Sequence, residues 1–438
     1  MMNIEKLFEV AKRKGIQDIQ VYISNSDQLS IEIFEGEVDK YEIAKSSSLT
    51  VKGLFNNKMG VYRTEVFEDE LIEEIVDTII ASAKVIDSLD DAIIYEGDDH
   101  YDEIKGLYSE QLAQVDVAKK IELIKEMDKK FHDYDKRVKN VDTSYSEVTN
   151  HVILQNSKGL KLENKANTSY VVGQVIVADE NDQRVGFDVQ ITNNFDEYVI
   201  DEVVKNTTDD ALASLGAKPL PSKNYEIIFN NLALATLFSA FQDIFSAQSV
   251  QKGLSLLKDK LETEVGSKLV NVIDDPLMQK SANSRSFDDE GVATKFKYLI
   301  QNGVLKTYLH NLVTAKKDGM KSTGNGFGGR IAAVNLKIEA GEHSLDEMIS
   351  SIKEGVLIKE VQGAHAGANS VSGEFSLQAS GYYIKDGKQD RPVALITVAG
   401  NFIDMLKNVV MVGNDSKMTY FGVTCPSIKI KSMPVSGS

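Results

Sequence analysis

A short segment with two prolines divides this chain into parts that must fold around separate cores. Residues 216–221 read Gly-Ala-Lys-Pro-Leu-Pro, and prolines break helices and remove donors from a β-ladder. The 438 residues also exceed what one ordinary hydrophobic core supports. We therefore expect a linker at 216–221, with a C-terminal domain over 222–438 and an N-terminal half before it.

The N-terminal half alternates helical stripes of apolar residues with short extended patterns. Apolar spacing predicts four helices, over about 4–13, 68–84, 109–134 and 194–215. Alternating apolar and polar residues between them predict antiparallel strands. Residues 88–108 are polar and acidic, which suits a connection. We therefore expect an N-terminal α+β domain over 1–105 and a middle α+β domain over 106–218.

The pattern changes beyond residue 221. A strand is predicted over 225–229 and an apolar helix over about 232–245, followed by many short extended segments. Helices segregated from antiparallel-looking strands are typical of the α+β class. We predict an α+β fold, with antiparallel sheets and long helices in the N-terminal half and a β-rich C-terminal domain.

The charge balance argues against a nucleic-acid partner. The chain carries 66 acidic and 49 basic side chains, a net charge of −17, and the basic residues are dispersed. A phosphate backbone would be repelled rather than neutralised by such a surface. We expect no direct binding to nucleic acid, since the clustered basic footprint of such proteins is missing.

The cysteine count and the hydropathy exclude further classes of protein. The single cysteine, Cys425, excludes an internal disulfide framework and a cysteine-rich zinc site, and we interpret it as a small buried hydrophobe. No run approaches the roughly 18 apolar residues that a membrane span needs. We expect a soluble, cytoplasmic protein without a membrane partner.

The histidines do not form a recognisable metal motif. Six are present, no two of them within four or five positions, and neither HExxH nor HExxxH occurs. A zinc site usually draws at least two ligands from one local pair. We interpret the histidines as surface or hydrogen-bonded residues. His365, between Gly363 and Gly367, is the one whose loop context suits a functional cleft.

Two other patterns match functional motifs only superficially. Gly324, Gly326 and Gly329 fit GxGxxG, but a helical pattern precedes them and an extended one follows, the reverse of a dinucleotide fingerprint. We expect a loop that borders a cleft. The neighbouring acids at 274–275 and 288–290 are typical of solvated turns.

Several short segments together point to one family. They are Asn156-Ser157-Lys158-Gly159, Phe287 to Thr294, Lys321 to Gly324, Gly413 to Ser416, and the long run from Ala366 to Gly437. In this combination they resemble the TldD/PmbA family, also called modulator of DNA gyrase. The TldD type of that family carries an HExxxH zinc motif on a helix. Because this chain has none, it resembles the PmbA (TldE) type.

The resemblance implies an architecture and a partner. It implies an α+β N-terminal half joined to a β-rich C-terminal domain, and assembly as a homodimer or as a heterodimer with a TldD-type subunit. The complex would be a protease that cleaves peptides or unfolded proteins inside a closed chamber. Zinc is expected only in the TldD-type partner, and this chain is expected to need no cofactor.

The resemblance also locates the missing metal helix. The TldD-type helix falls soon after the interdomain linker, which here corresponds to about 237–250, LFSAFQDIFSAQSV. Aromatic and small residues occupy this stretch, and Gln242 and Asp243 head its few polar side chains. A lone carboxylate without imidazole partners does not hold Zn²⁺. Cys425 lies on the strand side of the Gly-rich loop that carries the third ligand in the TldD type, so we do not assign it as a ligand.

The peptide-binding surface is predicted in the segment from Gly367 to Glu374. Its small side chains would let a substrate backbone approach closely, and an asparagine can both donate and accept hydrogen bonds. The predicted substrate-binding residues are His365, Asn369, Ser370, Ser372, Gly373 and Glu374. No catalytic or metal-binding residue is predicted. A tight turn would require the same small residues.

Three functions remain open at this point. The first is a non-catalytic protease subunit that shapes a substrate cavity, where extended peptides bind by strand addition. The second is a self-sufficient peptidase or hydrolase, which a metal assay would distinguish. The third is a regulatory binding protein without proteolysis, which would not pair with a TldD-type subunit.

Overall fold

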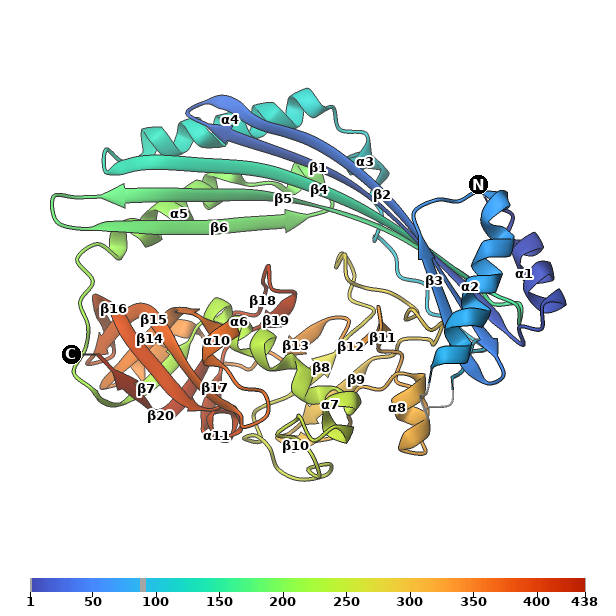
Figure 1. Cartoon of the computed structure of the whole chain (residues 1–438). Helices are drawn as coiled ribbons and strands as arrows, with labels where there is room; N and C mark the ends of the chain where they lie inside the picture. The colour runs from blue at the N-terminus through green and yellow to red at the C-terminus, as the bar shows by residue number, and fades with distance from the viewer. Residues whose placement is uncertain (1, 87–91, 438) are drawn as a thin grey trace.

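The computed structural model describes residues 2–86 and 92–437. Two halves lie one above the other and are joined by residues 216–221, which form no helix or strand (Figure 1). Both halves combine helices with largely antiparallel sheets, so the predicted α+β class and the β-rich C-terminal half are confirmed. No helix in the described part of the chain is long and apolar enough to cross a bilayer.

One long curved sheet dominates the N-terminal half, and we call it the arch sheet. Its strand order is β3-β2-β1-β4-β5-β6, and all neighbouring strands are antiparallel. The strands are β1 (Ile19–Phe34), β2 (Glu37–Phe55), β3 (Lys58–Thr64), β4 (Val138–Asn156), β5 (Lys161–Ala178) and β6 (Gln183–Thr192). The sheet therefore consists of two meanders that meet where β1 pairs with β4.

Among the described residues of the N-terminal half, five α-helices accompany the arch sheet. They are α1 (Ile4–Arg13), α2 (Ile72–Val85), α3 (Glu110–Ala113), α4 (Val117–Tyr134) and α5 (Ile200–Ala213), with 3₁₀ turns at Asp69–Leu71 and Phe195–Glu197. The prediction for 4–13 is confirmed. The single helix predicted over 109–134 is wrong, because Ser109 and Asp116 each cap a separate helix through the side-chain oxygen.

The helices cover one face of the arch sheet (Figure 1). Residues Ile19 and Val21 of β1 pack in one cluster with α1 and α2, while Ile31 and Ile33 pack with α4 and α5. These four side chains share a face because successive residues of a strand point to opposite sides. The other face is turned toward the C-terminal half.

The strands of the predicted domains 1–105 and 106–218 form this single sheet, so the proposed division near residue 105 stays a prediction. Of the predicted connection 88–108, residues 88–91 lie outside the described residues. The remaining part, 92–108, contains no helix or strand.

The C-terminal half contains two six-stranded sheets. One has the order β16-β15-β14-β7-β20-β17 and the other β10-β9-β8-β13-β19-β18. The first comprises β7 (Lys223–Phe229), β14 (Glu354–Gln362), β15 (Glu374–Lys385), β16 (Lys388–Asn401), β17 (Val409–Val412) and β20 (Ile428–Ser436). The second comprises β8 (Val272–Asp274), β9 (Lys297–Gln301), β10 (Val304–Leu305), β13 (Leu336–Ile338), β18 (Lys417–Met418) and β19 (Val423–Cys425).

A small hairpin and several short helices complete this half. The hairpin pairs β11 (Gly326–Phe327) with β12 (Arg330–Ile331). The helices are α6 (Asn231–Phe241), α7 (Ala247–Gln251), α8 (Leu312–Lys317), α9 (Leu345–Ser350), α10 (Ala364–Gly367) and α11 (Phe402–Lys407), with a 3₁₀ turn at Gln242–Phe245. The helix predicted over 232–245 is therefore observed as α6 followed by this turn.

Candidate functional site

The predicted peptide-binding segment forms a turn between α10 and β15. The Asn369 side-chain oxygen accepts hydrogen bonds from the N–H groups of Val371 (2.9 Å) and Ser372 (3.2 Å). The Asn369 N–H donates to the Glu374 carbonyl oxygen over 2.9 Å, which closes the turn. Most of the turn is exposed, as is His365 on α10. The structure thus brings five of the six predicted residues into one turn.

Two glycines explain why this segment is rich in small residues. A Cβ atom at Gly367 would lie 2.4 Å from the Ser376 carbonyl oxygen. Gly373 has φ +80°, and a Cβ atom there would lie 2.8 Å from Asn401 Nδ2. The turn itself therefore requires glycine at both positions. Neither of the two cavities described below is lined by the turn, so its contact with peptide stays a prediction.

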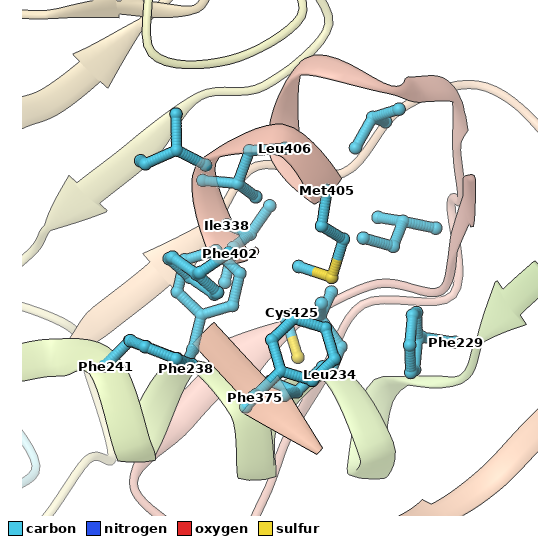
Figure 2. Packing of buried hydrophobic residues seen from close by; sticks show 14 of the residues in the cluster. Phe229, Leu234, Phe238, Phe241, Ile338, Phe375, Phe402, Met405, Leu406 and Cys425 are labelled. Atoms are coloured by element: carbon cyan, nitrogen blue, oxygen red, sulfur yellow. The ribbon is translucent and has the colours of Figure 1, made fainter. Parts of the chain in front are cut away.

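Residues 237–250, where the resemblance would place a TldD-type metal helix, lie largely in the hydrophobic core. Phe238 and Phe241 on α6 are at most 1% exposed, and Phe241 stacks on Phe402 with ring centroids 4.4 Å apart (Figure 2). Gln242 and Asp243 point to solvent instead. Within residues 2–86 and 92–437, no group of three His, Cys, Asp or Glu side chains could hold a metal ion. A zinc ion does not fit this position.

Cys425 lies in the same core, beside Leu234 and Phe375 (Figure 2). Its thiol is fully buried and donates to the Asn231 carbonyl oxygen over 3.1 Å. Burial raises the pKa of the Cys425 thiol, which disfavours the thiolate that a metal or an electrophile would need. The interpretation of Cys425 as a small buried hydrophobe is confirmed.

The foot of the arch sheet meets the C-terminal half at an acidic loop, residues 285–294, which we call the junction loop. Phe287 packs in one cluster with Val152, Leu154 and Leu160 of the arch sheet. Around this apolar contact, the Tyr101 hydroxyl donates to the Gly291 carbonyl oxygen (2.7 Å). Gln20 Nε2 donates to the Asp289 carbonyl oxygen (3.1 Å), and the Ala293 N–H donates to Asp98 Oδ2 (2.8 Å). The junction loop thus binds three separate segments of the N-terminal half.

Asp288, at the centre of the junction loop, is fully buried. Its carboxylate accepts hydrogen bonds from the backbone N–H groups of Glu290 (3.0 Å), Val292 (3.0 Å) and Gly326 (2.8 Å). Burial raises the pKa of Asp288 to about 7, and the negative charge of Glu290 acts in the same direction. The three N–H groups oppose this rise, because they favour the carboxylate.

The prediction of solvated turn acids is wrong for Asp288, and also for Asp274. The Asp274 side chain is fully buried and bonds Lys297 Nζ (3.0 Å) and Asn325 Nδ2 (2.7 Å). Hydrogen-bond partners offset part of the cost of burying each carboxylate, and each acid draws at least one of them from a distant part of the chain. Sequence neighbours gave no sign of these partners.

The glycines of the GxGxxG-like segment serve the junction loop. A Cβ atom at Gly324 would lie 2.6 Å from the Ala293 carbonyl oxygen, and one at Gly326 would lie 2.9 Å from the Glu290 carboxyl group. Glu290 is held there by the Leu312 N–H over 2.7 Å. These glycines let the β11–β12 hairpin approach the acidic residues closely.

A cavity of about 600 Å³ opens beside the junction loop, and we call it the junction cavity. Residues 101–108 form one wall and the first residues of β5, 161–165, form the other, while Ser286 and Phe287 contribute from the junction loop. A smaller cavity of about 170 Å³ lies near Glu290, Lys52 and Leu312. Sequence reasoning missed the junction cavity, because its walls come from three segments that are far apart in the chain.

Two polar side chains near this region lack complete hydrogen bonding. His310 is 1% exposed, and neither ring nitrogen has a hydrogen-bond partner among the described residues. The interpretation of every histidine as exposed or hydrogen-bonded is therefore wrong for His310, whose pKa is lowered by burial. Arg285 pairs with Asp289 (2.9 Å) and lies over the Phe287 and Phe327 rings, but its Nε and Nη2 have no partner in the described part of the chain.

Comparisons with known proteins agree on one family. The sequence model of the PmbA/TldA metallopeptidase central domain matches residues 110–215, and that of the C-terminal domain matches residues 222–437. A protein named metalloprotease PmbA homolog from Haemophilus influenzae is 27% identical over 98% of this chain and 94% of its own length.

Solved structures share the whole fold. A structure described as a putative modulator of a DNA gyrase, from Thermotoga maritima, superposes with a TM-score of 0.93 at 34% identity, over 99% of each chain. The fold is also that of TldE from Thermococcus kodakarensis, with a TM-score of 0.91 at 22% identity over 99% of this chain and 100% of the other. The chain therefore belongs to the PmbA/TldD family.

Proposed function

We propose that this chain is a PmbA/TldE-type subunit that pairs with a TldD-type metalloprotease subunit, does not itself catalyse cleavage, and contributes surface to the substrate cavity. The observation that carries the proposal is the aromatic core at 237–250, where the TldD type has its zinc helix. A position filled by Phe238 and Phe241 cannot present imidazole and carboxylate ligands to a metal without losing the core.

The family membership supports the partner. Relatives of this chain carry the names metalloprotease PmbA and metalloprotease TldD, and both types occur among them. Pairing would bring together the zinc of one chain and the binding surfaces of the other. The substrates we propose are peptides and unfolded proteins, held in an extended form. The proposed location is the cytoplasm.

Reconstitution with a TldD-type subunit from the same organism tests the assignment. We expect cleavage of an unfolded protein such as reduced, alkylated casein by the mixed complex, and none by this chain alone. Cleavage by this chain alone would support a self-sufficient hydrolase. Failure of the two chains to copurify would support a regulatory binding protein.

The predicted turn at 367–374 is tested in the same assay. Asn369→Ala removes the side-chain oxygen that holds the N–H groups of Val371 and Ser372, and Ser372→Val removes a hydroxyl near Glu374. If the turn contacts substrate, the mixed complex should cleave more slowly while both variants still pair and melt near the parent temperature. Parent-rate cleavage by both variants would assign the turn to scaffolding.

A further inference from the structure

Strand β5 is paired on both sides over only part of its length. It pairs with β4 from Lys161 to Val177, but with β6 only from Ser169 to Ala178. Just beyond the C-terminal end of β6, the Asn167 N–H donates to the Leu107 carbonyl oxygen over 2.9 Å. Residues 161–166 therefore form an open edge of the arch sheet, and we call them the open edge.

One hydrogen bond fixes which main-chain groups point outward. In an antiparallel ladder, alternate residues direct both N–H and C=O toward the same neighbour. Since Asn167 donates away from β4, the residues in phase with it, Lys161, Glu163 and Lys165, also direct N–H and C=O away from β4. All three line the junction cavity. Outside the β4–β5 ladder, the described residues provide no partner for the N–H groups of Glu163 and Lys165.

The opposite wall of the junction cavity is fixed by a hydrogen bond near each of its ends. One end of residues 101–108 is fixed where the Leu107 carbonyl oxygen accepts from Asn167 N–H, next to the open edge, and the other end is fixed by the Tyr101 hydroxyl on Gly291 (2.7 Å). Between these two points the cavity measures about 600 Å³. Residues 161–165 span roughly 13 Å at about 3.3 Å per residue. The length of the open edge therefore matches four or five residues of an extended chain.

The junction cavity is lined by both basic and acidic side chains, so it does not favour ligands of one charge. Lys105, Lys161 and Lys165 face Asp102, Glu103 and Glu163 around the same space. Two of these are already engaged: Glu163 bonds His151 Nε2 (2.7 Å), and Lys165 Nζ lies 3.7 Å from the centroid of the Tyr108 ring. Phe287 and Leu162 provide an apolar floor. Such a lining suits a peptide recognised mainly through its backbone.

We propose that the open edge binds an extended peptide as an added β-strand within the junction cavity. The unpaired N–H and C=O groups of Glu163 and Lys165 would pair with the peptide main chain, as in β-augmentation. One peptide side chain would contact Phe287, and the next would point to the opposite side. The inference deepens the proposed function and rests on it for the identity of the substrate.

Proline substitution tests the main-chain contact directly. Glu163→Pro removes an outward N–H without removing a donor from the β4–β5 ladder, and Glu163→Ala is the matched control that keeps this N–H. The probe is a fluorescein-labelled hexapeptide of alternating Val and Thr, and anisotropy is measured with the full chain and with the mixed complex. We expect Glu163→Ala to bind like the parent, and Glu163→Pro to lose affinity tenfold or more.

A modified ligand provides a second measurement that does not depend on folding of a variant. Methylation of alternate backbone nitrogens in the hexapeptide removes donors along one of its edges. We expect methylation on one set of alternate residues to abolish binding, and on the other set to leave it within about twofold, since a β-strand pairs through one edge at a time. The circular dichroism spectra and melting temperatures of both Glu163 variants serve as the fold check.

Several outcomes would overturn the proposal. They are binding by Glu163→Pro at parent affinity, equal loss in Glu163→Ala, and no binding of the unmodified peptide to either the chain or the mixed complex. Parent-rate cleavage by a complex that contains Glu163→Pro would also overturn it, while leaving the subunit assignment intact. Conversely, the chain could bind the peptide through the open edge but fail to pair with a TldD-type subunit. That outcome would refute the proposed function and support the proposed binding site.

Discussion

The arch sheet and the C-terminal half differ in how far apart in the sequence their paired strands lie. In the arch sheet, five strand pairings join β-strands, and four of them connect strands that follow each other in sequence. In the C-terminal half, β7 pairs both with β14 and with β20 at the end of the chain, and β13 pairs with the distant β19. One apolar cluster runs from Leu220 to Val435 through this half.

This difference suggests that the C-terminal half mainly provides stability and that the arch sheet mainly provides a binding surface. The C-terminal half closes on itself through contacts between distant segments, so its core should unfold as a unit. The arch sheet has one helix-covered face and leaves main-chain groups unpaired at the open edge. An unpaired edge is a liability for a stable protein unless something covers it or uses it. We therefore expect core substitutions to act on stability, and arch substitutions to act on binding.

The largest effect should come from the core. Phe241→Ala removes a ring that stacks on Phe402 (4.4 Å) and should lower the free energy of unfolding by about 3–5 kcal/mol. Phe187 of β6 is 43% exposed, and its ring centroid lies 5.4 Å from that of Tyr420 in the C-terminal half, so Phe187→Ala should cost less than about 1 kcal/mol. Urea unfolding of both variants measures the difference. Equal losses would contradict the division between the halves.

The junction between the halves should respond to pH through Asp288. Its pKa in the folded protein is raised to about 7, so between about pH 4 and pH 7 the folded state binds more protons than the unfolded state. Stability from this group is therefore fully present at low pH and is lost as the pH rises through 7. The loss should be on the order of 4 kcal/mol between pH 4 and pH 8.

Asp288→Asn isolates that contribution, because the amide does not titrate. The variant should be less stable overall. Its side-chain NH₂ group cannot accept a hydrogen bond, so at least one N–H group that donates to Asp288 would lose its acceptor. However, its unfolding free energy should vary less steeply with pH than that of the parent. Parallel pH profiles of parent and variant, measured by urea unfolding, would show that Asp288 keeps an ordinary pKa.

A smaller effect is expected where the hairpin meets the junction loop. Gly326→Ala places a Cβ atom 2.9 Å from the Glu290 carboxyl group, which the Leu312 N–H holds in position. The strain should cost about 1–3 kcal/mol. Gly266→Ala is the matched control, because its Cβ atom would lie at ordinary distance, 3.5 Å from the nearest atom described. If both variants have the same melting temperature, a Cβ atom at residue 326 causes no steric strain against Glu290.

Zinc should have the smallest effect of all. The purified chain should carry no stoichiometric zinc, and added zinc should leave its melting temperature unchanged, because ligands that bind the folded state raise that temperature. Elemental analysis and thermal melts measure this. One tightly bound zinc per chain that is lost in Cys425→Ala would refute the prediction that this chain binds no zinc.

Local sequence patterns predicted much of the secondary structure. The helix predicted over 4–13 matches α1, and the strand predicted over 225–229 lies within β7. The prediction that 237–250 holds no metal rests on its residue types alone, and it stays a prediction. The helix and the strand were predicted correctly because the periodicity of both elements depends on residues that are close in the chain.

The junction and the open edge needed the tertiary structure. Asp288 appeared solvated because its neighbours are acidic, yet the donor that seals it, Gly326, is 38 positions away. Tyr101 holds Gly291 from 190 positions away. The β5 edge is open because β6 ends at Thr192, opposite Ser169, so its pairing with β5 does not reach residues 161–166. Burial of a polar group and pairing of a strand edge depend on distant segments meeting, which local patterns do not encode.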